Sequence, residues 1–283
     1  MVRLAHFSDV HVTASPTSEG WRAFRGKRLA GTTNYFLGNR RKHFAQVTEQ
    51  LPALLASAED ADHVLCTGDL TQMSFESEFA RCASLLGDRL QQSARFSFLP
   101  GNHDRYTRKS AEEQRFERWF GSLTTTDWPW LRFLDGGVAL VSIDVVRPRH
   151  LLDSSGLCGE AQRARLHRVL TRRELREQFV IVALHYGLLR ADGRPDSISH
   201  RVRDYRAILD ILDDPSCRVD LVVHGHIHDS FVLGCSGYSI ACSGSATDLH
   251  HRPGYNVYEI DPATRRFQVE RRSWSETERR YLA

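Results

Sequence analysis

Hydrophobic residues in the first hundred positions follow two patterns, short apolar runs and helically spaced faces. The runs predict buried strands at residues 2–7, 62–67 and 96–99. Between them, apolar side chains recur at helical spacing, which predicts amphipathic helices over about residues 41–58 and 75–86. This alternation predicts an α/β fold in which neighbouring parallel strands are joined by right-handed crossovers.

The second half of the chain shows the same two patterns. A two-glycine turn at residues 135–137 separates two predicted strands, and an Arg-rich helix is predicted over about residues 159–176. Further strands are predicted at residues 179–184 and 219–223, and residues 230–274 indicate antiparallel strands. No internal repeat, low-complexity linker or block of charge divides the 283 residues, so a single domain over residues 1–283 is expected.

Composition restricts the class of protein without identifying it. With 41% hydrophobic and 26% charged residues the chain is typical of a globular protein, and a net charge of +3 does not by itself indicate a nucleic-acid partner. The six cysteines include no C-x-x-C pair, which favours a reducing, cytoplasmic setting. The apolar runs are too short to span a membrane, and the first residues are not typical of a signal peptide.

Residues 12–43 are an insert rich in basic and aromatic side chains. These side chains are Trp21, Arg22, Phe24, Arg25, Lys27, Arg28, Tyr35, Phe36, Arg40, Arg41 and Lys42. This mixture fits contact of residues 21–43 with a phosphorylated or lipid-linked substrate, with nucleic acid, or with the inner membrane surface, where the protein would be peripheral. A solvated charged face whose aromatic rings reach into the core is an equally good interpretation.

Polar side chains with metal-binding chemistry follow the predicted strands. They are Asp9, His11, Asp69, Asn102, His103, Asp104, His185, His226 and His228. Because the carboxyl ends of parallel strands share one sheet edge, these side chains are expected to converge there. Alternation along an extended backbone would place Asp9 and His11 on the same side, and likewise His226 and His228.

Each of these residues alone also fits an ordinary strand end or turn, but the set predicts a metal centre. Histidine and carboxylate ligands without cysteine suit Mn, Fe or Zn. Seven of the nine side chains, all except His103 and Asp104, are candidate ligands. Because one tetrahedral ion uses fewer ligands than this, two metal ions are expected.

Five blocks resemble the calcineurin-like metallophosphoesterase superfamily in their residues and order. They are Asp9-x-His11, Gly68-Asp69, Gly101-Asn102-His103-Asp104, His185 and Gly225-His226-x-His228. The resemblance implies a four-layered α/β/β/α sandwich with two divalent or trivalent metal ions.

The resemblance also implies a role for each residue. Asp9, His11 and His228 would hold one ion. Asn102, His185 and His226 would hold the other, with Asp69 bridging the two. His103 would face the phosphoryl oxygens and the leaving group, and Asp104 would orient its imidazole.

A metal-dependent phosphoester hydrolase is therefore expected, in particular a phosphodiesterase in which a hydroxide between two metal ions attacks phosphorus in line. Bacterial class III cyclic-nucleotide phosphodiesterases are similar, but they usually have His and Pro where this chain has Tyr186 and Gly187. Hydrolysis of the pyrophosphate in UDP-diacylglucosamine is the alternative, because the insert suits a lipid-bearing substrate. A non-catalytic metal-binding scaffold is an alternative of another class, although the chain retains His103 and every predicted ligand. The small size and weak net charge of the chain disfavour a nuclease.

Overall fold

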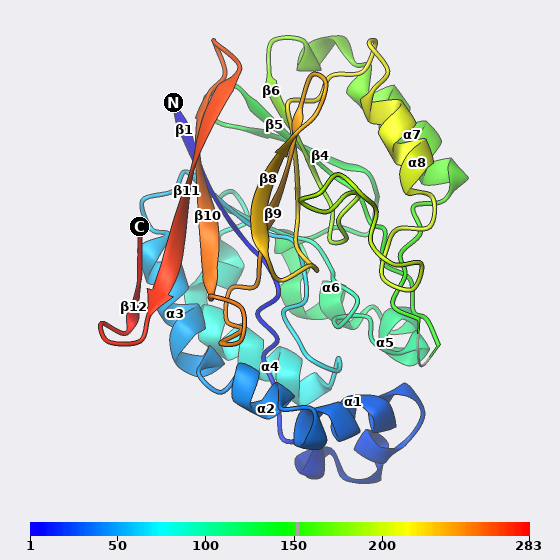
Figure 1. Cartoon of the computed structure of the whole chain (residues 1–283), viewed down its shortest axis with the longest axis vertical. Coiled ribbons are helices and arrows are strands. Elements are labelled where there is room, and N and C mark those ends of the chain that lie inside the picture. Colours follow the sequence, from blue (N-terminus) through cyan, green and yellow to red (C-terminus); the bar gives the residue numbers. More distant parts are fainter. Residues whose placement is uncertain (151–152) are drawn as a thin grey trace.

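Two six-stranded sheets lie face to face at the centre of the molecule (Figure 1). The computed structural model describes residues 1–150 and 153–283. The first sheet has the order β12-β11-β10-β1-β2-β3. Its strands are β1 (Val2–Phe7), β2 (His63–Cys66), β3 (Phe96–Phe98), β10 (Gly254–Asp261), β11 (Arg266–Ser275) and β12 (Arg280–Leu282). As predicted, β1, β2 and β3 are parallel, and β10 pairs antiparallel with β1.

The second sheet has the order β4-β5-β6-β7-β9-β8. Its strands are β4 (Trp130–Leu134), β5 (Val138–Ser142), β6 (Phe179–Ala183), β7 (Leu221–His224), β8 (Ser230–Gly234) and β9 (Ser239–Ser243). Every residue of β5, β6 and β7 is buried, which explains their nearly continuous apolar sequences. The sequence predicts only antiparallel strands after residue 230. Instead, the β8–β9 hairpin folds back so that β9 lies parallel to β7.

Three apolar clusters separate four layers. The middle cluster lies between the sheets and includes Leu4 and Ile181. The other two clusters lie between each sheet and its covering helices. These helices are α3 (Val47–Ser57), α4 (Glu76–Leu86) and α6 (Arg115–Phe120) on the first sheet, and α7 (Glu160–Leu170) and α8 (Tyr205–Leu212) on the second. The predicted α/β/β/α sandwich is confirmed.

Two predicted helices are interrupted in the structure. Residues 41–58 are divided between α2 (Arg40–His43) and α3, because the chain bends between them and buries Phe44. The Arg-rich helix ends with α7 at Leu170, and a separate turn, η4 (Arg173–Leu175), buries Leu175. In both places a buried side chain outweighs the local preference for a continuous helix.

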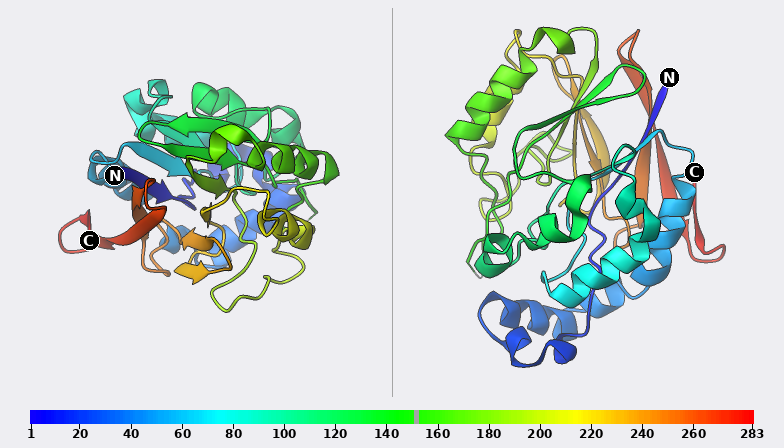
Figure 2. Two further views of the ribbon diagram at one scale, coloured as in Figure 1. Left: turned by 90° about the horizontal axis from the view of Figure 1, so that it is seen from above. Right: turned by 180° about the vertical axis from the view of Figure 1, so that it is seen from behind.

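The insert forms helices at one end of the molecule (Figures 1 and 2, dark blue). It contains η1 (Pro16–Phe24), α1 (Lys27–Leu37) and α2. The remaining helical segments are η2 (Gly87–Gln91), α5 (Arg108–Glu112) and η3 (Gly121–Leu123). No helix among residues 1–150 and 153–283 is long and apolar enough to cross a membrane.

Candidate metal centre

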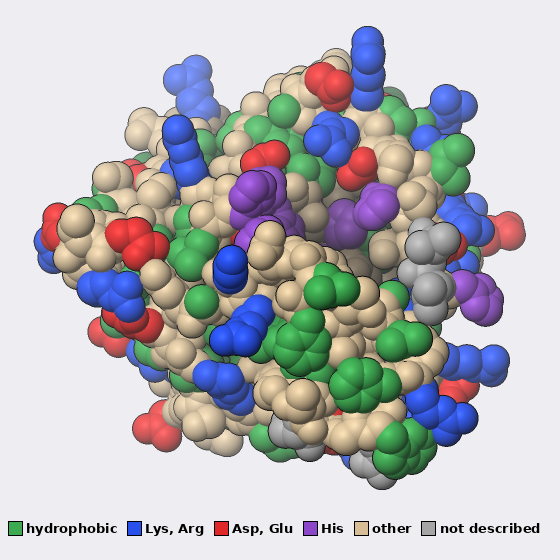
Figure 3. Space-filling model, turned by 60° about the horizontal axis from the view of Figure 1, so that its bottom comes forward, with side chains coloured by type: hydrophobic (Ala, Val, Ile, Leu, Met, Phe, Trp, Pro, Cys, Tyr) green, Lys and Arg blue, Asp and Glu red, His purple; other side chains and the backbone are tan. Residues whose placement is uncertain are grey.

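Loops at the carboxyl ends of five strands bring the predicted polar residues together. The loops follow β1, β2 and β3 in the first sheet and β6 and β7 in the second. They carry Asp9, His11, Asp69, Asn102, His103, His185, His226 and His228. On the surface, histidines gather beside a hollow (Figure 3, purple). The site therefore lies where the edges of the two sheets meet.

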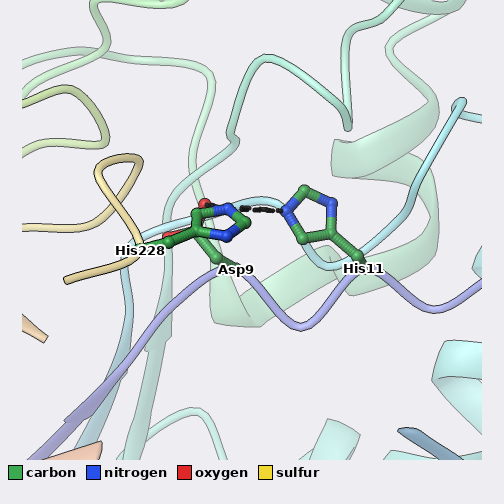
Figure 4. Close-up of side chains that lie close together, drawn as sticks. All are labelled: Asp9, His11 and His228. Atoms are coloured by element: carbon green, nitrogen blue, oxygen red, sulfur yellow. Dashed lines mark hydrogen bonds and ion pairs between the residues drawn. The ribbon is translucent and has the colours of Figure 1, made fainter. Parts of the chain in front are cut away.

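The first ligand group consists of Asp9, His11 and His228, whose side chains point toward one another (Figure 4). The Nε2 atoms of His11 and His228 are 3.3 Å apart. Asp9 Oδ1 lies 3.7 Å from His11 Nε2 and 3.4 Å from His228 Nε2. Asp9 Oδ1 is buried and has no hydrogen-bond partner in the described part of the chain. A buried carboxylate oxygen facing two imidazole nitrogens fits a bound cation.

The second ligand group consists of Asp69, His185 and His226, with Asn102 beside it. His185 Nε2 lies 3.5 Å from Asp69 Oδ2 and 3.0 Å from Asn102 Oδ1. Asp69 Oδ2 is also 3.8 Å from His11 Nε2, in the first group. Asp69 thus lies between the two groups.

Hydrogen bonds from surrounding residues orient the ligands. His228 Nδ1 donates to Asp248 Oδ2 at 2.8 Å, and His185 Nδ1 donates to the Thr67 carbonyl at 2.8 Å. These bonds leave the Nε2 atoms of both rings free to face a metal ion. Asp9 accepts the backbone N–H of His226 with its other oxygen, Oδ2, at 2.8 Å. Each of these groups is therefore fixed in orientation by the protein itself.

Charge within the site also favours a cation. Burial opposes a positive charge on His185 and His228, but nearby carboxylates raise the pKa of each ring to about 9. Burial likewise opposes the charge of Asp69, yet the surrounding histidines hold its pKa below the ordinary value. Two buried carboxylates thus provide negative charge that metal ions would balance. The candidate ligands are histidine, aspartate and asparagine, a set whose chemistry suits Mn, Fe or Zn.

The backbone of these loops is not extended, contrary to the expectation from alternation. Asp9, His11, Asp69, His226 and His228 all have left-handed φ values, between 50° and 67°. This conformation costs an L-residue about 1–2 kcal/mol, and such strain is characteristic of functional sites. His226 and His228 consequently point to different ligand groups and not to one side of a strand.

Asp104 does not orient the His103 imidazole, so that expectation is wrong. The Asp104 carboxylate accepts the backbone N–H groups of Gly101 at 2.9 Å and Thr71 at 2.8 Å. It therefore ties the loop after β3 to the loop after β2. The carbonyl of Gln72 takes the orienting role instead, because it accepts the Nδ1–H of His103 at 2.6 Å.

Asp248 is the residue at this site that the sequence interpretation missed. It follows β9, which is parallel to β7, so its strand ends at the same edge as the other ligands. Had β9 been recognised as a parallel strand, the strand-end argument would have included Asp248.

The sequence model of the calcineurin-like phosphoesterase family matches residues 2–230. The chain belongs to this family. Calcineurin-like phosphoesterases are in general metal-dependent phosphoester hydrolases, and this chain has clusters of His and Asp that fit such a metal site. No curated protein matches the sequence.

Solved structures with the same fold include three distant proteins. A purple acid phosphatase from yellow lupin (Lupinus luteus) seeds has a TM-score of 0.56 at 11% identity, covering 99% of this chain and 52% of the lupin chain. GAP50, the anchor in the inner membrane complex of Plasmodium, has a TM-score of 0.55 at 12% identity, with coverages of 100% and 87%. A candidate 5′-nucleotidase from Staphylococcus aureus, in complex with α-ketoglutarate, has a TM-score of 0.53 at 15% identity, with coverages of 95% and 52%.

The phosphoesterase thus spans about half the length of the lupin and Staphylococcus chains. At these identities the structural similarity establishes the fold alone.

Replacing Asp248 with Asn should weaken metal binding by the phosphoesterase about 10–100-fold, because the carboxylate that orients His228 is lost. Calorimetric titration of metal into the metal-free protein measures the change. Asp229→Asn is the matched control, since Asp229 is exposed and pairs with His251 and not with His228. Equal affinity in Asp248→Asn and wild type would contradict the orienting role.

Proposed function

We propose that the phosphoesterase hydrolyses phosphodiesters with two metal ions, one held by each ligand group, and with Asp69 shared between them. The observation that carries this proposal is the position of Asp69 Oδ2, 3.5 Å from His185 Nε2 and 3.8 Å from His11 Nε2. One oxygen atom thus faces a histidine from each group. Such an arrangement suits paired ions better than a single one.

The reaction forms a bond from a water oxygen to phosphorus and breaks the ester P–O bond. Metal ions, when bound, lower the pKa of the attacking water and neutralise charge on the phosphoryl oxygens. His103 would give a proton to the leaving oxygen. Its ring lies 4.8 Å from that of His11, and the Gln72 carbonyl holds Nδ1–H, which leaves Nε2 as the atom that would face the leaving oxygen. Burial lowers the pKa of His103, so the negative charge of a bound phosphoryl group would have to favour the protonated ring before Nε2 could donate.

Space beside the centre favours a diester, which carries a substituent on each side of phosphorus. A cavity of about 490 Å³ opens next to His228. It is lined by His228, Asp229, Ser230, His250, His251, Arg252, Arg271 and Ser273. On the other side of the centre, the rings of His103 and Tyr106 are stacked beneath the insert. Each substituent would therefore have a surface to contact.

His103→Gln should retain two metal ions per chain but lower kcat about 100-fold or more on bis(p-nitrophenyl) phosphate, because the proton donor is lost. Asp69→Asn should lower both the metal content and the activity, since its oxygen lies between the groups. Metal content is measured by mass spectrometry after dialysis, and rates are measured with Mn²⁺ supplied. His63→Gln is the control, because His63 lies at the amino end of β2 and outside the candidate ligand groups of the described residues.

Two outcomes would contradict this account. Equal metal loss in His103→Gln and Asp69→Asn would make His103 a ligand. Absence of wild-type hydrolysis of every phosphodiester tested with Mn²⁺, Fe²⁺ or Zn²⁺ would overturn the proposed activity and favour the scaffold.

A second candidate function is hydrolysis of the pyrophosphate of a lipid-linked nucleotide at the inner membrane surface. It is favoured by exposed apolar side chains on η1 and α1, which include Trp21, Leu29 and Phe36. Leu37, at the end of α1, is 80% exposed. Apolar side chains of this kind, in a segment rich in basic residues, suit peripheral contact with an anionic membrane.

Leu37→Glu should reduce co-sedimentation with vesicles that contain about 30% anionic lipid, by about tenfold, because an apolar contact is lost and a negative charge is added. Phe133→Glu is the control, since Phe133 is also exposed but lies on β4, in the second sheet. If wild type does not sediment with vesicles, or if both variants lose binding equally, the insert is not a membrane contact.

A further inference from the structure

Four aromatic rings form a continuous row across the candidate metal centre. Tyr106 stacks on His103 with ring centroids 5.4 Å apart, and His103 packs edge-on against His11 at 4.8 Å. Phe44 lies 4.7 Å beyond His11. The row therefore begins at the proposed proton donor's neighbour, Tyr106, and ends beside the first ligand group.

A cation from the insert lies over each end of this row. Lys27 Nζ is 4.7 Å from the centroid of Tyr106, and the Arg40 guanidinium is 5.2 Å from that of Phe44. Lys27 is the first residue of α1, and Arg40 is the first residue of α2. The insert thus places positive charge on two sides of the metal centre.

Neither cation forms an ion pair with a carboxylate among the described residues. Within residues 1–150 and 153–283, Lys27 Nζ and the Arg40 guanidinium form no ion pair or hydrogen bond, only the contacts with aromatic rings. Arg28, from the same insert, differs. Its guanidinium lies over Phe75 and also donates to the carbonyls of Met73 and Ser74, which fixes it in a structural role. Lys27 and Arg40 keep their hydrogen-bond donors free.

The position of Lys27 is fixed by the wall of the site. The Tyr106 hydroxyl donates to the Lys27 carbonyl at 3.4 Å. Gly31, one turn along α1, lies so close that an added Cβ would be 2.8 Å from Met73 Sδ and 3.0 Å from the Tyr106 hydroxyl. Burial of Phe44 holds the ring beneath Arg40 in the same way. Packed side chains therefore fix the positions of both cations relative to the metal centre.

The charges also act on the site. Burial lowers the pKa of Lys27, and the charges of Asp153 and, to a smaller extent, Asp69 oppose this shift. The Arg40 guanidinium lies 5.2 Å from the centroid of Phe44, whose ring is 4.7 Å from that of His11. Both cations thus lie within electrostatic range of the place where the substrate reacts.

We propose that Lys27 and Arg40 form an anion-binding subsite at the rim of the metal centre, and that it receives a second phosphoryl group attached to the reacting one. This inference rests on the proposed phosphodiesterase function and narrows its substrate class to diphosphate diesters. A simple diester carries one negative charge, which the metal centre would balance. A diphosphate carries a further charge, and free ammonium and guanidinium groups are the usual protein partners for it.

The test compares UMP with UDP, which differ by one phosphoryl group, as ligands of the Mn²⁺-loaded full-length protein in isothermal titration calorimetry. We expect wild type to bind UDP at least about tenfold more tightly than UMP, because a charge-assisted hydrogen bond contributes about that factor. Lys27→Gln and Arg40→Gln should each reduce this preference severalfold and leave UMP binding nearly unchanged. Lys27→Arg should retain it, since the charge is kept. Arg41→Gln, which changes the exposed neighbour of Arg40, is the matched control and should behave as wild type.

Three results would overturn the proposed subsite. The first is that wild type binds UMP and UDP with equal affinity. The others are that Lys27→Gln and Arg40→Gln weaken the binding of UMP and UDP equally, or that both variants keep the full preference for UDP over UMP. Unaltered UMP binding also reports that each variant is folded. Hydrolysis of bis(p-nitrophenyl) phosphate by wild type is measured in parallel. Its absence would contradict the phosphodiesterase function, whereas the binding comparison would still decide on the subsite.

Two further substrates distinguish the possible sources of the second phosphoryl group. Turnover of UDP-glucose would indicate a soluble diphosphate diester, and turnover of UDP-diacylglucosamine alone would indicate a lipid-linked one. In either case, Lys27→Gln and Arg40→Gln should lower kcat/KM for the better diphosphate substrate by a larger factor than for bis(p-nitrophenyl) phosphate. Equal losses on both substrates would contradict the inference.

Discussion

The buried carboxylates of Asp9 and Asp69 are the constraint on which the edge of both sheets depends. Each uses one oxygen to accept a backbone N–H from a different loop, His226 for Asp9 at 2.8 Å and His103 for Asp69 at 2.7 Å. The bond from Asp9 thereby joins the two sheets. The other oxygen of each faces histidines, so negative charge remains concentrated inside the protein. Burying such charge is costly without a counter-charge. A bound cation would supply this counter-charge and would therefore stabilise the site.

Glycines allow the loops to approach these carboxylates. A Cβ at Gly225 would lie 1.9 Å from Ser8 Oγ and 2.4 Å from Asp9 Oδ2. One at Gly101 would lie 2.1 Å from Asp69 Oδ1. The glycines that directly precede Asn102 and His226 are therefore required by close packing, and His226 itself has a left-handed conformation.

Much of the fold follows from local sequence, because buried strands and amphipathic helices have distinct periodicities. The convergence of polar residues could also be predicted, since parallel strands share one edge. The direction in which each side chain points could not be predicted from the sequence. Asp9 and His226 have left-handed conformations that no periodicity indicates, and Asp104 binds backbone N–H groups instead of an imidazole. Asp248 was missed because the parallel pairing of β9 with β7 depends on how a hairpin folds back, which is a long-range contact.

The central claim is that two metal ions share Asp69. Diffraction from crystals grown with Mn²⁺, collected at the manganese absorption edge, tests it directly. We predict two anomalous peaks about 3.5–4 Å apart. One should contact Asp9, His11 and His228, the other Asn102, His185 and His226, and Asp69 should contact both. A single peak, or two peaks of which only one contacts Asp69, would contradict the account.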